Sequence, residues 1–260
     1  MKKKTRHVPS PNALRYLAGV GVILLVFAVY RTDAHMHAMR IGVLRNVQLV
    51  LAAAFPPQGA TRLLDVPFHR QEHALSCEIA SVRSALLATG LDVPESILLS
   101  ALPRDTTPKT TDAAGTVTWG DPNKGFVGDI NGRMPSTGFG VHAPALKEVI
   151  HLYAATRDIR ADDAPALVTA INRGHPVIVW SALGKTPRRI SWNTPTGDTV
   201  HTALYEHTLV VAGYRGSSAA IESVFVVDPL TGLREESWEE FVWRTGFLDH
   251  QAIEIIPVRF

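Results

Sequence analysis

The sequence predicts an α+β fold, because helical patterns come first along the body of the chain and a mostly antiparallel sheet follows them. Hydrophobic residues make up 46% of the 260 residues and charged residues 19%, so the chain can bury a substantial core. Spacing typical of helices occurs at 76–89, 94–102, 143–154, 164–173 and 237–244. Short apolar runs that predict strands occur at 63–68, 176–180, 207–214, 223–227 and 252–258.

Capping residues set the ends of these helices. Ser76 is a favourable N-cap and Gly90 a favourable stop for the first helix, and Gly174 ends the fourth. Between the helices, residues 103–140 follow no regular pattern and are rich in Gly, Pro, Thr and Asp. A long irregular stretch inside a compact domain is usually functional, so we expect this segment to line a binding groove.

The charge of the chain is unevenly distributed. Residues 1–31 hold six of the 26 basic residues and no acid, so residues 32–260 carry 20 basic and 24 acidic groups. A mildly acidic body argues against a nucleic-acid partner, which needs a basic face. The Lys124-Gly125 pair lacks the spacing of a P-loop, so no nucleotide partner is expected either.

The N-terminus predicts a membrane anchor. Residues 16–30 carry no charge and follow a basic stretch, which indicates a signal-anchor helix with the body of the chain outside the cytoplasm. A cleaved signal peptide, giving a secreted protein, is the alternative, but no small-residue cleavage pattern follows the apolar run. Residues 32–61 form a juxtamembrane segment with an amphipathic helix at 40–55, and residues 62–260 form the working domain.

The chain has one cysteine, which excludes an internal disulfide and metal sites built on paired cysteines. Cys77 follows the N-cap serine, so it lies in the first turn of the predicted helix. The positive end of a helix dipole stabilises a thiolate and lowers the pKa of a thiol. This position favours a nucleophile over the alternative, a small buried structural cysteine.

A thiol nucleophile needs a base and an orienting partner for that base. His207 opens the apolar run HTLVVAGY, and a second run, ESVFVVD, ends at Asp228. A hairpin centred on Ser217-Ser218 would pair these two residues and place their side chains on one face. Asp228 could then fix the imidazole tautomer, although a core histidine with satisfied hydrogen bonds is an open alternative. The Cys77 amide and the side chain of Gln71 are candidates for the oxyanion hole.

Several segments resemble one peptidase family. LDVPFHRQEHALSCE is similar to the segment that leads into the active site of the bacteriocin-processing, double-glycine leader cysteine peptidases, and more so to that of their stand-alone bacterial relatives. EHTLVVAGY resembles the histidine strand of that family, VFVVDPLTG its third catalytic segment, and WGDPNKGFVGDING a signature of the stand-alone branch. The resemblance covers roughly residues 63–257. It implies a papain-like fold, thiol-dependent hydrolysis of peptide bonds, and the catalytic set Gln71, Cys77, His207 and Asp228.

The expected partner is a peptide or protein substrate, and no cofactor or metal is expected. Within the irregular stretch, aromatic and acidic side chains are candidates for substrate contact, with a structural role equally open: Trp119, Asp121, Phe126 and Asp129. Three alternatives remain: another acyl transfer on the same residues, a non-catalytic peptide-binding module, and a metal enzyme using His201 and His207. The last lacks any zinc-binding motif.

Overall fold

A seven-stranded sheet with both faces covered forms the centre of the fold. The structure, a computed structural model, describes residues 61–258, which belong to the unit that begins at Gly59. The strands run in the order β12-β11-β10-β7-β13-β6, β1 pairs with β10, and all neighbours are antiparallel. Their bounds are β1 Thr61–Leu63, β6 Ala155–Arg160, β7 Val177–Ala182, β10 Glu206–Ser217, β11 Ala220–Asp228, β12 Gly232–Ser237 and β13 Gln251–Ile256.

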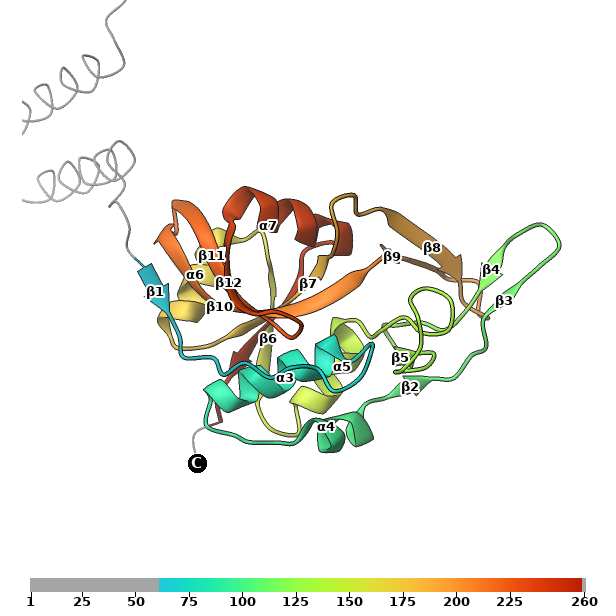
Figure 1. Ribbon diagram of the computed structural model, residues 1–260, viewed down its shortest axis with the longest axis horizontal. Helices are drawn as coiled ribbons and strands as arrows, with labels where there is room; N and C mark the ends of the chain where they lie inside the picture. Colours follow the sequence, from blue (N-terminus) through green and yellow to red (C-terminus); the bar gives the residue numbers. More distant parts are fainter. Residues whose placement is uncertain (1–60, 259–260) are drawn as a thin grey trace, which may run out of the picture. The chain divides into compact units, whose positions relative to one another are not determined.

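Helices cover the two faces of this sheet (Figure 1). One face packs against α3 (Cys77–Ala88), α4 (Glu95–Ala101) and α5 (Ala143–Ile150), and the other against α6 (Ala164–Asn172) and α7 (Trp238–Thr245). Strand β7 shows why both faces are apolar: Ile178 and Trp180 join the core on the α3 side, while Val177 and Val179 join the core on the α6 side. The expected mixture of helices and an antiparallel sheet is confirmed.

The stretch 103–140 contains only two-residue strands, so its prediction as an irregular segment agrees with the structure. These are β2 (Arg104–Asp105), β3 (Thr110–Thr111), β4 (Val117–Thr118) and β5 (Phe126–Val127). β3 and β4 form a second sheet with β8 (Arg189–Asn193) and β9 (Thr199–Ala203), which extends from the main sheet in Figure 1. Trp119, Phe139 and Trp192 pack edge-on or tilted at its base and form a separate small core.

Several sequence-based expectations need correction. The strand predicted at 63–68 is wrong, because β1 ends at Leu63 and the chain continues as an extended loop. Strands β6, β8, β9 and β12 were not predicted, since their mixed polar residues give no continuous apolar run. A short 3-10 helix, Gly246–Leu248, also follows α7. The predicted signal-anchor and the amphipathic helix at 40–55 lie outside the described residues, and no helix within 61–258 is long and apolar enough to cross a membrane.

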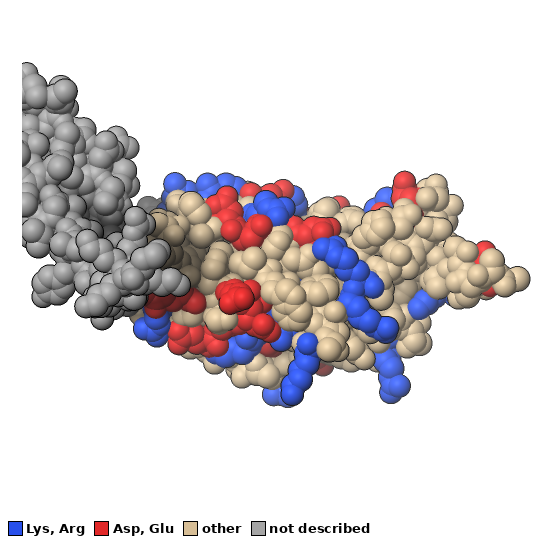
Figure 2. All heavy atoms as spheres, turned by 90° about the horizontal axis from the view of Figure 1, so that it is seen from above, with Lys and Arg blue, Asp and Glu red and all other residues tan. Residues whose placement is uncertain are grey.

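The surface drawn in Figure 2 carries charges of both signs. Acidic and basic side chains are mixed over the left half of the coloured surface, and a narrow run of basic side chains near its middle is surrounded by uncharged surface. It therefore offers no continuous basic surface of the kind that holds a phosphate backbone.

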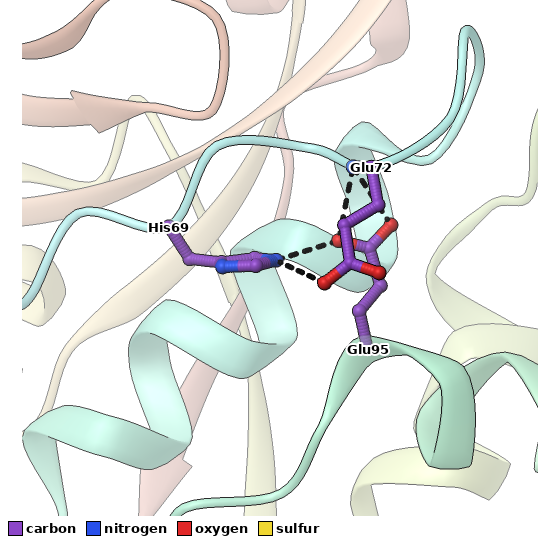
Figure 3. A group of neighbouring side chains, drawn as sticks. All are labelled: His69, Glu72 and Glu95. Carbon is purple, nitrogen blue, oxygen red and sulfur yellow. Dashed lines mark hydrogen bonds and ion pairs between the residues drawn. The ribbon is translucent and has the colours of Figure 1, made fainter.

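A buried carboxylate fastens the loop at 64–76 to the helices beneath it (Figure 3). Glu95, fully buried at the start of α4, accepts a hydrogen bond from the ring of His69 at 2.6 Å and from the amide of Glu72 at 3.2 Å. The amide of His69 also donates to the hydroxyl of Ser84 on α3. These bonds fix the course of the loop that carries Gln71 to the start of α3.

Replacing Glu95 with alanine should destabilise the domain by about 2 kcal/mol, because half-buried hydrogen bonds from His69 and Glu72 lose their acceptor. Urea unfolding measures this change. Glu148→Ala, which removes an exposed carboxylate from α5, is the control and should stay within about 0.5 kcal/mol of the wild type. Equal stability of the two variants would show that the loop does not depend on Glu95.

Candidate active site

A cavity of about 120 Å³ brings together three of the predicted catalytic residues. Gln71, Cys77 and His207 line it, at the end of the sheet where α3 and β10 both begin. The rest of the lining is mostly apolar: Ala74, Leu75, Met134, Phe139, Leu183, Tyr205 and Leu230, together with Glu206.

Cys77 is the first residue of α3, as predicted, but its thiol is neutral rather than poised as a thiolate. The sulfur is buried and donates a hydrogen bond to Glu78 Oε2 at 3.3 Å. Burial raises the pKa of Cys77 well above its usual value, and negative charge on Glu78 or Glu206 raises it further. The expectation of a lowered thiol pKa is therefore wrong for this arrangement.

The N-cap of α3 also differs from the expectation. Ser76 occupies the N-cap position, yet its side chain makes no capping hydrogen bond. Its hydroxyl instead accepts a bond from the His73 amide at 3.1 Å and so closes the turn before the helix. Ser76 thus supplies no side-chain cap to the amides in the first turn of α3.

His207 is held by a buried carboxylate. Its Nε2 lies 2.9 Å from Asp228 Oδ1, and both side chains are about 96% buried. Burial by itself would raise the pKa of Asp228, but the His207 hydrogen bond and charge, the Leu230 amide and the Arg234 cation together lower it to about 2. Asp228 is therefore ionised at any ordinary pH and fixes the imidazole through Nε2, leaving Nδ1 for another proton.

The hairpin register that suggested this pair is nevertheless wrong. β10 and β11 pair Val210 with Val227 and Val211 with Val226, so His207 lies two residues beyond the position opposite Asp228. Two residues are one full period of a strand, so both side chains still project from the same face. The contact is diagonal rather than directly cross-strand, and long side chains can bridge such a gap.

Gln71 lines the cavity, but its amide nitrogen is engaged elsewhere. Nε2 donates to the carbonyls of His73 at 2.8 Å and Ala74 at 3.0 Å, while its Oε1 is buried without a partner among the described residues. The backbone amide of Gln71 donates to Pro229, next to Asp228. The loop thus brings Gln71 to the site, and an oxyanion role requires its side chain to rotate.

The four predicted substrate contacts lie outside this cavity. Trp119 and Phe126 are buried in two different cores, and Asp121 pairs with Lys124. Trp119 and exposed Asp129 border a separate surface groove of about 480 Å³. Their role in substrate contact stays a prediction.

Sequence reasoning missed two carboxyl groups beside the cavity. Glu78 and Glu206 directly adjoin Cys77 and His207 in the sequence, and each is at least 97% buried. Acidic residues immediately next to a nucleophile and its base are a signal that could have been noticed. Among the described residues, His69, Glu72 and Glu95 are the group close enough to share a metal ion, but the hydrogen bonds of Figure 3 already account for their arrangement.

Comparison with known proteins identifies the family. The family model described as the Peptidase_C39 like family matches residues 63–247. The uncharacterized protein YvpB of Bacillus subtilis is 31% identical over 166 residues, which is 60% of this chain and 62% of YvpB. This chain therefore spans less than two thirds of the length of that relative.

The fold also occurs in a solved structure. A crystal structure described as a C39-like peptidase from Bacillus anthracis matches with a TM-score of 0.62 at 24% identity, over 77% of this chain and 99% of that chain. The peptidase domain of Streptococcus ComA, a bi-functional ABC transporter, matches with a TM-score of 0.44 at 17% identity, over 74% and 99%. The resemblance seen in the sequence is confirmed. Since the family model covers well over half of the residues, the chain belongs to the Peptidase_C39 like family.

Proposed function

We propose that the chain is a cysteine peptidase in which Cys77 attacks the peptide carbonyl and His207 acts as its base. The observation that carries this proposal is the cavity where Cys77, His207 and Gln71 meet, with His207 oriented by the buried carboxylate of Asp228. Membership of a family of C39-like peptidases supports the same chemistry.

The proposed reaction follows from the free positions around His207. Because Nε2 is bound to Asp228, Nδ1 takes the proton of the Cys77 thiol as the sulfur attacks. His207 then passes that proton to the leaving amine, and water, deprotonated by His207, hydrolyses the acyl-enzyme. The Cys77 amide at the start of α3, with a rotated Gln71, stabilises the oxyanion.

The proposed substrate is a peptide or protein with a small apolar side chain next to the cleaved bond. The cavity is small, and its walls are largely uncharged carbon: Leu75, Met134, Phe139, Leu183 and Leu230. A large or charged side chain there would lose hydration without gaining a partner.

Cys77→Ala and His207→Ala should each lower kcat/KM for peptide hydrolysis by about 10⁴-fold while the domain stays folded, because each removes one member of the reacting pair. A peptide library with mass-spectrometric product analysis measures the loss and separates hydrolysis from other acyl transfers. His201→Ala, which removes an exposed histidine of β9, is the matched control and should match the wild type.

Two outcomes would contradict this proposal. Unchanged turnover in Cys77→Ala would exclude the thiol as nucleophile. Peptide binding without any turnover in the wild type would indicate a non-catalytic peptide-binding module.

Gln71→Ala should lower kcat by about 10²-fold and change KM little, because an oxyanion donor acts mainly in the transition state. Steady-state kinetics on the best library peptide gives both constants. An equal rise in KM with unchanged kcat would assign Gln71 to substrate binding instead.

We also propose that the domain works outside the cytoplasm on a single N-terminal membrane anchor. The uncharged run at 16–30 after a basic stretch supports this placement. Protease added to spheroplasts, whose plasma membrane is still intact, should then degrade the domain. The chain should also fractionate with membranes. Protection from the protease would contradict the placement, and loss of the first thirty or so residues, read by mass spectrometry, would mean secretion.

A further inference from the structure

Four glutamates of the domain are almost completely buried, but only two of them are paired with a basic side chain among the described residues. Glu95 is bound by the ring of His69, and Glu254 by Arg157 at 2.5 Å and His175 at 2.7 Å. Glu78 and Glu206 form no ion pair with any described residue, although they are 1% and 3% exposed. A buried carboxylate without a cation is costly and tends to keep its proton.

The two carboxyls that lack a cation approach the same side of Gly140. A Cβ atom on Gly140 would lie 2.5 Å from Glu78 Oε1 and 2.7 Å from Glu206 Oε2, so glycine is the residue that leaves room for both. Glu78 Oε1 also accepts a hydrogen bond from the Val141 amide at 2.7 Å, whereas Glu206 Oε2 is buried without a partner among the described residues.

The thiol of Cys77 donates its hydrogen bond to one member of this pair. Cys77 donates to Glu78 Oε2, and no hydrogen bond joins Cys77 to His207 among the residues of 61–258. We propose that Glu78 and Glu206 form a carboxyl pair that keeps at least one proton at neutral pH and holds Cys77 at rest as a neutral thiol, turned away from His207. Both are positioning residues, and their role depends on the proposed function of Cys77 as nucleophile.

In the part of the chain that the structure describes, the groups around the pair offer no positive charge that would ionise it. On α3 the neighbour is Cys77, and on β10 it is His207, which is already bound to Asp228 of β11. On the segment before α5 the contact is the Val141 amide, which bonds Glu78, whereas the ring of His142 lies against Asn123 and Thr202. Burial lowers the pKa of His142 to about 4, so its ring is neutral. The thiol proton passes to His207 when the sulfur turns to attack, and the pair keeps its own proton throughout.

The sign of the pH dependence follows. Burial raises the pKa of Glu78 to about 7, and burial together with the charge of Glu78 raises that of Glu206 well above its usual value. As the pH rises through about 7, negative charge appears beside the sulfur and opposes the thiolate. The thiol is therefore restrained more strongly above neutral pH than below it.

The test is the rate of Cys77 alkylation by iodoacetamide against pH in the full chain, where the single cysteine makes the signal unambiguous. Glu78→Gln should react faster than the wild type, by about threefold for each unit by which the pKa of the Cys77 thiol falls. Each unit gives about tenfold more thiolate, but a thiolate of lower pKa is a weaker nucleophile. The ratio of the two rates should grow as the pH rises through about 7. Glu206→Gln should show a smaller increase at more alkaline pH.

Glu222→Gln, the same change at an exposed position of β11, is the matched control and should overlay the wild type. If a variant simply failed to fold, its alkylation rate would follow the pH profile of an ordinary exposed thiol, and its thermal unfolding transition would be lost. A second readout is the infrared band of a protonated carboxylic acid near pH 7, recorded on the wild type and on Glu206→Gln. The wild-type spectrum remains informative even if a variant does not fold.

The proposal is overturned if the rate ratio of Glu78→Gln to wild type stays constant with pH, or if the wild type shows no protonated carboxyl band near neutral pH. Neither readout depends on peptide turnover. If Cys77→Ala is inactive and the alkylation-rate ratio does not change with pH, this inference fails and the proposed peptidase stands. If Cys77→Ala is active, the proposed peptidase fails, and the carboxyl pair can still be measured.

Discussion

The site depends on the close packing of α3 against β10. Ser81 donates its hydroxyl hydrogen to the carbonyl of Thr208 at 3.1 Å, and small neighbours such as Ala80 and Ala85 are fully buried at this helix. Ser81 lies one helical turn after Cys77, and Thr208 directly follows His207. This one contact therefore sets the nucleophile and its base at a common cavity, although they come from residues 130 positions apart in the chain.

The sequence was most informative where one residue determines the local geometry. Ser76 and Gly90 placed α3 to within a residue, and the apolar runs located β7, β10 and β11. The register of the hairpin was predicted wrongly because the turn lies one residue later than expected: Ser217 pairs with Ala220, and the two bulges near Val211 and Arg215 offset each other. Apolar spacing does not reveal this position of the turn. The pairing of His207 with Asp228 survived the error because a shift of two residues preserves the face.

What the sequence could not supply was the electrostatic environment of the thiol. A helix N-terminus favours an anion by about 0.3–1 kcal/mol at an exposed site. Full burial of a charge without a partner costs several times more, and two adjacent carboxyls add to that cost. Burial therefore decides the resting state of Cys77, and burial depends on how the chain folds around Glu78 and Gly140 rather than on the local motif.

Two buried carboxyls without cations weaken a fold, since apolar side chains of similar volume would pack there at less cost. Stable proteins break such a rule mainly where function requires it. Glu95 and Glu254 show that this chain supplies a partner when a buried carboxylate serves structure. Within residues 61–258, no such partner lies at Glu78 or Glu206, directly beside the proposed nucleophile and its base, and this supports a role in controlling the thiol. A thiol that is neutral at rest is also protected from oxidation, which acts on the thiolate, and this matters for a chain with a single cysteine.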